Sequence, residues 1–194
     1  MKRYSVIFLL FLFCCILFCS SSQNPKVLIV TELGDIKVEI FEKKAPVTAK
    51  NFLKYVDNNL FEGAYFYRVV TMDNQPDNDI KIEVIQGGIN PEKKDKRFPP
   101  IKHETTDMTG ILHKNGVISM ARNEPGTATS EFFICIGDQP ELDFGGKRNP
   151  DEQGFAAFGK VIEGMDVVKK IQKQHAEGQF LNPKIKIMNI IRVK

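Results

Sequence analysis

The sequence is poor in cysteine and histidine and contains no tryptophan. Three of its four cysteines fall within the first 19 residues, which leaves Cys135 alone in the rest of the chain. A lone cysteine cannot form an internal disulfide, so the fold must be held by packing. The histidines are scattered, and no cysteine pair has the spacing of a zinc site; they are His103, His113 and His175. We therefore expect neither a metal nor a cofactor, and we place these histidines on the surface or in turns.

Motifs for phosphate, calcium or covalent chemistry are absent as well. No glycine-rich loop of the phosphate-binding type follows a predicted strand. The acidic segment 73–79 lacks the glycine and the closing glutamate of a calcium loop. Ser119, Ser130 and Cys135 have no base near them in the sequence, so no residue is indicated as a covalent nucleophile.

A large excess of charge of one sign is also missing. Without Lys2 and Arg3 in the N-terminal segment, 25 basic residues face 24 acidic ones, a net charge of +1. This balance gives no sign of a basic face for nucleic acid, and we expect none as a partner. Apolar and aromatic residues stay plentiful beyond the N-terminal segment, which excludes a disordered chain. The remaining length of about 175 residues suits one domain with one core.

Residues 1–18 have the pattern of a secretory leader, a basic start followed by a nearly unbroken apolar run. The run is shorter than the roughly 20 residues of a membrane-spanning helix. Cys19 closes it and opens a serine-rich stretch, which resembles the lipobox of bacterial lipoproteins, although Phe18 replaces the usual small residue. We favour lipidation of Cys19, with 19–25 as a flexible tether to a membrane; cleavage after Ser22 is the alternative. Either way we expect an exported protein, in the periplasm or anchored to a membrane.

The segment 26–194 is predicted to form one β-rich domain. The run 36–40 alternates apolar and charged side chains, as a strand with one buried face does, and Gly34-Asp35 before it indicates a hairpin turn. The other predicted strands are 27–33, 64–71, 81–86, 117–121, 132–136, 155–161 and 184–193, and apolar residues three and four apart predict helices over 46–57 and 165–173. This pattern favours a mainly β fold, a closed eight-stranded antiparallel β-barrel capped by two α-helices.

Six sequence blocks resemble those of one enzyme family and occur in the family's order. They are Ala45–Phe52, Phe66–Val70, Val84–Gly88, Gly116–Arg122, Thr129–Ile134 and Phe155–Val161. On these blocks the segment 26–194 resembles the cyclophilins, which are peptidyl-prolyl cis-trans isomerases with an eight-stranded barrel and two helices. The resemblance implies catalysis of rotation about Xaa-Pro bonds without a covalent intermediate, and proline-containing polypeptides as partners.

The resemblance also implies a set of site residues. Arg68 matches the family's catalytic arginine, whose guanidinium is aimed at the prolyl nitrogen, and Gln86 matches the glutamine that hydrogen-bonds substrate backbone. The implied substrate-binding residues are Val84 in place of a pocket methionine, Ala121 facing the peptide, Phe133 at the pocket floor, Leu142 at the rim and Phe155 where many members have histidine.

Several positions depart from the family pattern. Glu83 stands where the family has a pocket phenylalanine, unless the strand register lets Ile82 take that place. Glu141 aligns near a tryptophan that contacts cyclosporin, so we expect weak binding of that drug. Glu131 replaces a glutamine, which keeps an acceptor and adds a charge. The segment 71–80 is about ten residues longer than the family's turn after the arginine strand, which indicates a rearranged pocket entrance.

Two classes of function remain open at this point. One is an exported isomerase that assists the folding of secreted proteins, for which proline isomerisation can limit the rate. The other is a cyclophilin-like module that binds proline-containing segments with little turnover; a purely structural surface lipoprotein is a third interpretation. We favour the enzyme because Arg68 and Gln86 are retained, and we expect a monomer.

Overall fold

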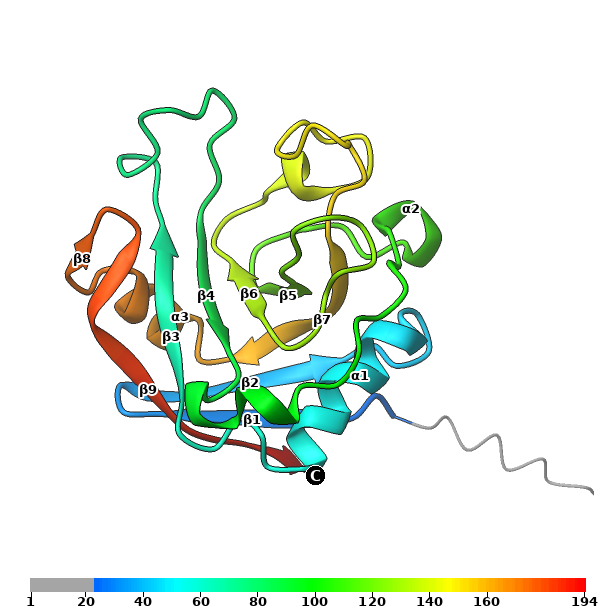
Figure 1. Ribbon diagram of the computed structural model, residues 1–194, viewed down its shortest axis with the longest axis vertical. Helices are drawn as coiled ribbons and strands as arrows, with labels where there is room; N and C mark the ends of the chain where they lie inside the picture. The colour runs from blue at the N-terminus through cyan, green and yellow to red at the C-terminus, as the bar shows by residue number, and fades with distance from the viewer. Residues whose placement is uncertain (1–22) are drawn as a thin grey trace, which may run out of the picture.

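Eight strands close into a ring in the computed structural model, which describes residues 23–194 (Figure 1). They are β1 (Lys26–Thr31), β2 (Gly34–Ile40), β3 (Ala64–Val70), β4 (Val84–Gly88), β5 (Val117–Met120), β6 (Phe132–Cys135), β7 (Ala156–Glu163) and β9 (Phe180–Val193). The order is β1-β2-β7-β5-β6-β4-β3-β9, and β9 pairs back onto β1. Neighbours in the ring are antiparallel, so the predicted barrel is confirmed; β8 (Ala176–Glu177) is a short addition paired with β9.

The hairpin between β1 and β2 turns one step earlier than predicted. Glu32 and Leu33 form the turn, while Gly34, predicted as a turn residue, pairs with Thr31 as the first residue of β2. Gly34 has a φ of 132°, and a Cβ there would lie 2.8 Å from a methyl carbon of Val167. The glycine is therefore needed for backbone conformation and for close packing beside the turn.

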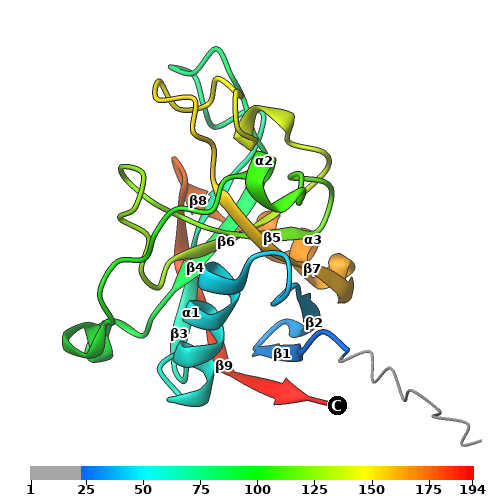
Figure 2. The ribbon, with the colours of Figure 1, turned by 90° about the vertical axis from the view of Figure 1, so that its right-hand side faces the viewer.

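The two predicted helices are present, with three shorter ones in connections that carry no helical periodicity. The helices are α1 (Pro46–Asp57), α2 (Thr106–Thr109) and α3 (Met165–Gln172), and the 3₁₀ helices are η1 (Pro91–Lys96) and η2 (Pro140–Leu142). Figures 1 and 2 place α1 and α3 on opposite sides of the barrel. Phenylalanines fill the interior beneath α1: the Phe52 ring lies 5.0 Å from Phe158 and 5.5 Å from Phe132, measured between centroids.

Helix α1 receives its N-terminal cap from a distant part of the chain. Ala45 precedes the helix and offers no side-chain acceptor. Instead the carboxylate of Glu104 accepts hydrogen bonds from the backbone N–H of Val47 (3.1 Å) and of Thr48 (2.8 Å), and from the Thr48 hydroxyl (2.7 Å). A negative charge at this end also interacts favourably with the helix dipole. The start of α1 is thus tied to the connection between β4 and β5.

Two long connections rise from the same side of the barrel, residues 71–83 between β3 and β4 and residues 136–155 between β6 and β7 (Figures 1 and 2). The first is ordered by Gln75, which is 1% exposed. Its amide donates to the carbonyl groups of Thr71 and Ile82 and accepts from the Ile82 N–H. These bonds take the Ile82 backbone out of the sheet, so β4 begins at Val84 and not at Lys81 as predicted.

Candidate active site

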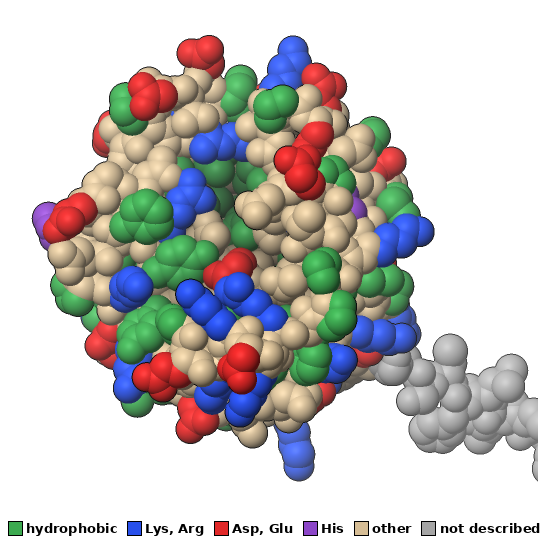
Figure 3. All heavy atoms as spheres, in the orientation of Figure 1, with side chains coloured by type: hydrophobic (Ala, Val, Ile, Leu, Met, Phe, Trp, Pro, Cys, Tyr) green, Lys and Arg blue, Asp and Glu red, His purple; other side chains and the backbone are tan. Residues whose placement is uncertain are grey.

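A cavity of about 260 Å³ lies beside β3, β4 and β6, and the two long connections contribute to its wall. Figure 3 shows a hollow with hydrophobic side chains inside and basic side chains at its edge. The lining residues are Arg68, Ile82, Val84, Gln86, Ala121, Arg122, Asn123, Phe133, Leu142, Arg148, Asn149 and Phe155. Every site residue predicted from the sequence is among them except Cys19, which lies outside the residues that the structure describes.

The floor of the cavity is a small apolar cluster separate from the main core. It consists of Val70, Ile82, Val84, Phe133, Cys135 and Leu142, with Ala121 and Phe155 packed against it. Phe133 is 4% exposed, and the Phe155 ring stands edge-on to it with 5.3 Å between centroids. The cavity is slightly smaller than the roughly 300–1,000 Å³ of drug-sized ligand sites, and such a floor suits one compact apolar group.

The Arg68 guanidinium is held along two sides by neutral acceptors. Oε1 of Gln86 accepts from Nη1 at 2.8 Å, and Oε1 of Gln179 accepts from Nε at 3.0 Å and from Nη2 at 2.6 Å. Burial lowers the pKa of Arg68, although an arginine with an ordinary value above 12 stays charged at neutral pH. Within residues 23–194 Arg68 forms no ion pair. The guanidinium is therefore held in one orientation, and its positive charge has no carboxylate partner at the cavity.

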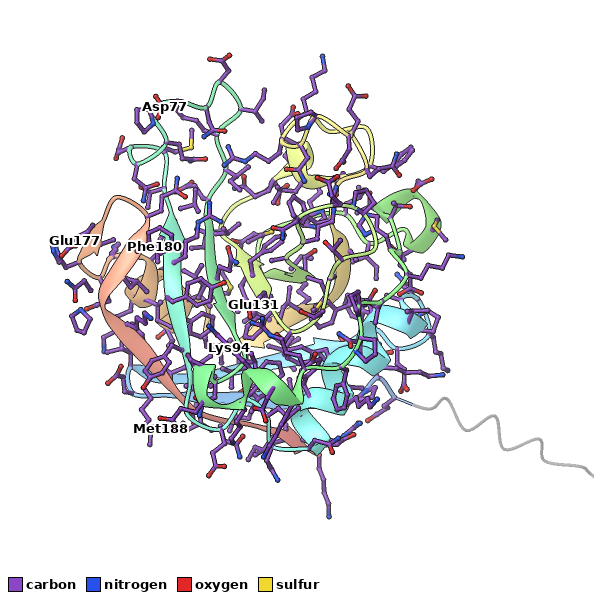
Figure 4. The ribbon with its side chains drawn as sticks, viewed as in Figure 1. Asp77, Lys94, Glu131, Glu177, Phe180 and Met188 are labelled. Carbon is purple, nitrogen blue, oxygen red and sulfur yellow. The ribbon has the colours of Figure 1, made fainter. Side chains whose placement is uncertain are left out.

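Gln179 is a site residue that the sequence did not indicate. It lies between β8 and β9, on a hairpin that Figure 4 marks by Glu177 and Phe180. Its own amide donates to the carbonyl of Asn74 (3.0 Å), and the Asn74 amide donates back to the carbonyl of Gly178 (3.1 Å). The long connection after β3 thus holds the glutamine that holds Arg68. The residues around Gln179 show no periodic pattern, and the length of segment 71–80 was the one indirect signal.

Gln86 is oriented by a chain of hydrogen bonds that runs away from the cavity. Its amide donates to the Tyr67 hydroxyl (2.8 Å), which donates to Oε2 of Glu131 (2.8 Å). Arg97 donates to the other oxygen of Glu131 at 2.8 Å, so the charge that replaces the family's glutamine is neutralised there. Burial, and then the charge of Glu131, raise the pKa of Tyr67. Figure 4 shows Glu131 beside η1, the helix that carries Lys94.

His113 contradicts the prediction that the histidines lie on the surface or in turns, because it is 1% exposed. Its Nδ1 lies 2.7 Å from Oδ1 of Asp143 and its Nε2 3.0 Å from the Ser119 hydroxyl oxygen. The ring stacks on Phe133 with 5.9 Å between centroids. Polar partners on both ring nitrogens make this burial possible. Ser119 is completely buried, so its hydroxyl supports the cavity floor and does not reach a ligand.

The departures from the family pattern have clear places in the structure. Ile82 lines the cavity, whereas the Glu83 carboxylate accepts a hydrogen bond from Gln172 of α3 and is not part of the lining. The Glu141 carboxylate accepts from the backbone N–H of Lys147 (2.8 Å) and is not part of the lining. The aromatic wall at Phe155 faces a cation, since the Arg122 guanidinium carbon lies 5.1 Å from the ring centroid.

Within residues 23–194, no helix is both long and apolar enough to cross a membrane. In the same part of the chain, histidine, cysteine, aspartate and glutamate form no group of three or more that could hold a metal ion.

Comparisons with known proteins agree on one family. The model of the family "Cyclophilin type peptidyl-prolyl cis-trans isomerase/CLD" matches residues 26–192. A peptidyl-prolyl cis-trans isomerase of Acinetobacter baylyi is 39% identical over 150 residues, which cover 76% of this chain and 72% of that one. Peptidyl-prolyl cis-trans isomerase B of Escherichia coli is 37% identical over 144 residues, 73% of this chain and 80% of that one.

Solved structures show the same fold. A cyclophilin-type peptidyl-prolyl cis-trans isomerase of Cryptosporidium parvum superposes with a TM-score of 0.67 at 22% identity, over 88% of this chain and 98% of that one. A second crystal structure of that protein, obtained in the presence of the dipeptide Ala-Pro, gives a TM-score of 0.66 at 23% identity, over 87% and 99% of the two chains.

Proposed function

The chain belongs to the family of cyclophilin-type peptidyl-prolyl cis-trans isomerases, and we propose that Arg68 and Gln86 carry the isomerase reaction on proline-containing polypeptides. The observation that supports this proposal is the uncompensated Arg68 guanidinium, fixed by Gln86 and Gln179 beside a buried apolar floor. The Ala-Pro dipeptide present with the Cryptosporidium relative is a ligand of the same chemical class.

The reaction requires only that the site prefers a twisted amide. Rotation about an Xaa-Pro bond has a barrier of roughly 18–20 kcal/mol because it breaks amide resonance. In the twisted state the prolyl nitrogen becomes an acceptor, and a donor that bonds to it there lowers the barrier. One charge-assisted hydrogen bond from Arg68 contributes about 1.5–3 kcal/mol, or about ten- to a hundredfold in rate.

The apolar floor and Gln86 supply the remaining requirements. The proline ring is apolar and compact, so it suits the apolar floor to which Phe133, Val84 and Leu142 contribute. Gln86 is turned by its bond to Tyr67 so that its carbonyl faces Arg68, and it anchors substrate backbone beside the guanidinium. Because the substrate is held on both sides of the rotating bond, the prolyl nitrogen is positioned at Arg68, and this positioning lowers the barrier further.

The test is an isomerisation assay on a short Xaa-Pro peptide, using the wild type and Arg68→Ala. We expect kcat/KM to fall at least tenfold in the variant while its circular dichroism spectrum and melting temperature stay unchanged. Arg192→Ala is the matched control, since that arginine pairs with Asp57 on the surface and does not line the cavity. Equal activity in wild type and Arg68→Ala would refute the assignment of Arg68. Peptide binding without catalysis in the wild type would favour a binding module.

We extend the proposal to the cellular role of the protein. The leader pattern of residues 1–18 and the position of Cys19 support export, lipidation of Cys19 and assistance to the folding of exported proteins. We propose a monomer as its working form. Mass spectrometry of the protein purified from cells tests the anchor: we expect a diacylglycerol-modified Cys19 in the wild type and none in Cys19→Ala. An unmodified chain that begins at Gln23 would mean cleavage after Ser22 instead.

A further inference from the structure

Three arginines line the cavity, and no carboxylate does. They are Arg68, Arg122 and Arg148. Only Arg122 is neutralised, because Asp151 accepts from its Nη1 and its Nη2 at 2.8 Å each. The Arg122 side chain is 1% exposed and also donates to the carbonyl of Gly154, so it is committed to the structure. The other two arginines give the cavity a net positive charge.

Arg148 is a second cation without a charged partner. It lies in the connection between β6 and β7, and its Nη1 donates to the backbone carbonyl of Ile80 in the connection between β3 and β4. No ion pair in the described part of the chain includes Arg148. Burial lowers its pKa, and so does the nearby charge of Arg68. Two like charges are therefore held near each other by neutral acceptors alone, which costs free energy unless a ligand supplies the opposite charge.

Four carboxylates near the cavity have partners other than Arg148. Glu131 is paired with Arg97, and Asp151 with Arg122. Glu83 accepts from Gln172 of α3. Glu141 accepts from the Lys147 backbone amide. The Arg148 backbone N–H donates to the Glu141 carbonyl (3.1 Å), but none of these four carboxylate groups accepts from the Arg148 side chain. No ion pair joins Arg148 to Asp77 or Asp79 of the connection that carries Ile80 either, so its charge remains available at the cavity.

We infer that Arg148, with Arg68, makes this isomerase select proline segments that carry a carboxylate directly before or after the proline. The inference rests on the proposed function and narrows its substrate class. Arg148 lines the same cavity as the apolar floor, so with the proline ring on this floor the residue before or after it comes within reach of the Arg148 guanidinium. An arginine guanidinium donates two parallel hydrogen bonds to the two oxygens of a carboxylate, which makes glutamate and aspartate its natural partners.

The size of the preference follows from the partial exposure of Arg148. A charge pair at a half-buried site is stronger than a fully exposed one and is still screened by salt. We expect kcat/KM for a glutamate peptide to exceed that for the isosteric glutamine peptide by about five- to tenfold at low ionic strength. The gain should appear mainly as a lower KM, because the carboxylate is bound in the ground state as well as in the twisted state.

The experiment compares matched peptides by NMR exchange spectroscopy, which needs no coupled protease and leaves the flanking residues free to vary. The peptides carry Glu-Pro, Gln-Pro, Pro-Glu or Pro-Gln in one common sequence, and the protein is the wild type, Arg148→Gln, Arg148→Lys or the control Lys147→Gln. Lys147 is exposed, carries the same charge one residue away and does not line the cavity.

The expected result is a preference for one or both glutamate peptides in the wild type, in Arg148→Lys and in Lys147→Gln. Arg148→Gln should lose it, and the wild type should lose most of it in 0.5 M salt, where the Debye length falls to roughly 4 Å. Equal kcat/KM for the glutamate and glutamine peptides in the wild type would overturn the inference and leave the isomerase intact. A preference that survives in Arg148→Gln would overturn the role of Arg148. No acceleration of any peptide would overturn the proposed function, and the selectivity with it.

Discussion

Replacing Gln179 by alanine tests whether orientation of Arg68, and not its charge alone, determines the rate. The substitution removes the acceptor of two N–H···O bonds, at 3.0 and 2.6 Å, and leaves Arg68 tied only to Gln86. Bonds to charged groups contribute about 1.5–3 kcal/mol, and water replaces part of this at a half-buried position. A loss of about 1–2 kcal/mol in the twisted state corresponds to a roughly five- to thirtyfold fall in kcat/KM.

The fall should appear in kcat, because Gln179 bonds to Arg68 and does not line the cavity where the peptide binds. Exchange spectroscopy at several peptide concentrations separates kcat from KM. Gln174→Ala is the control, since that amide bonds only to the carbonyl of Lys170. A Gln179→Ala enzyme within twofold of the wild type would refute the argument that Gln179 positions the guanidinium.

Four further predictions concern stability, reactivity and drug binding. Glu104→Ala should lower the free energy of unfolding by about 1–3 kcal/mol, measured in urea, because it strips the cap from α1; an unchanged midpoint would contradict the capping role. The Arg122 guanidinium holds the pKa of Asp151 at about 2, below its ordinary 3.8, so this ion pair stabilises the fold above about pH 4 and is lost as the pH falls towards 2. The unfolding free energies of the wild type and Asp151→Asn should therefore converge as the pH falls towards 2. A difference that stays constant with pH would contradict a stabilising role of this ion pair. Burial raises the pKa of the Cys135 thiol. Mass spectrometry should therefore find Cys135 alkylated by iodoacetamide only after unfolding. Alkylation of Cys135 in the native protein would contradict its burial. Cyclosporin should bind weakly because Glu141 aligns near the tryptophan that contacts the drug in the family, and nanomolar affinity in a competition titration would show this expectation to be wrong.

Much of the fold could be predicted because strands with one buried face carry their own pattern. The alternation over 36–40 and the apolar spacing over 46–57 correspond to β2 and α1 in the structure. Boundaries failed where a side chain competes with the sheet for backbone groups. At residue 82 the Gln75 amide takes the hydrogen bonds that a longer β4 would need. Nothing local to residues 81–83 marks that competition.

The site could be predicted only as far as single positions match a family. Arg68 and Gln86 were predicted in that way and both line the cavity, but the groups that hydrogen-bond to them were not predicted. Gln179 reaches Arg68 from 111 residues away, and Glu104 reaches α1 from 56 residues away. Such contacts depend on which connections become neighbours in the folded barrel. The spacing of residues in the sequence does not indicate which connections these are. The burial of His113 has the same origin, since its partner Asp143 lies in another connection.

The place of β9 in the ring has a consequence for how the molecule is made. This strand is the last one along the chain, and it pairs with both β1 and β3. A ribosome releases the chain from the N-terminus, so β1 and β3 keep unpaired edges until residues 180–193 emerge. Open edges are templates for pairing with other chains. A nascent chain stopped before β9 is therefore an aggregation hazard, because the barrel closes only after residues 180–193 have emerged.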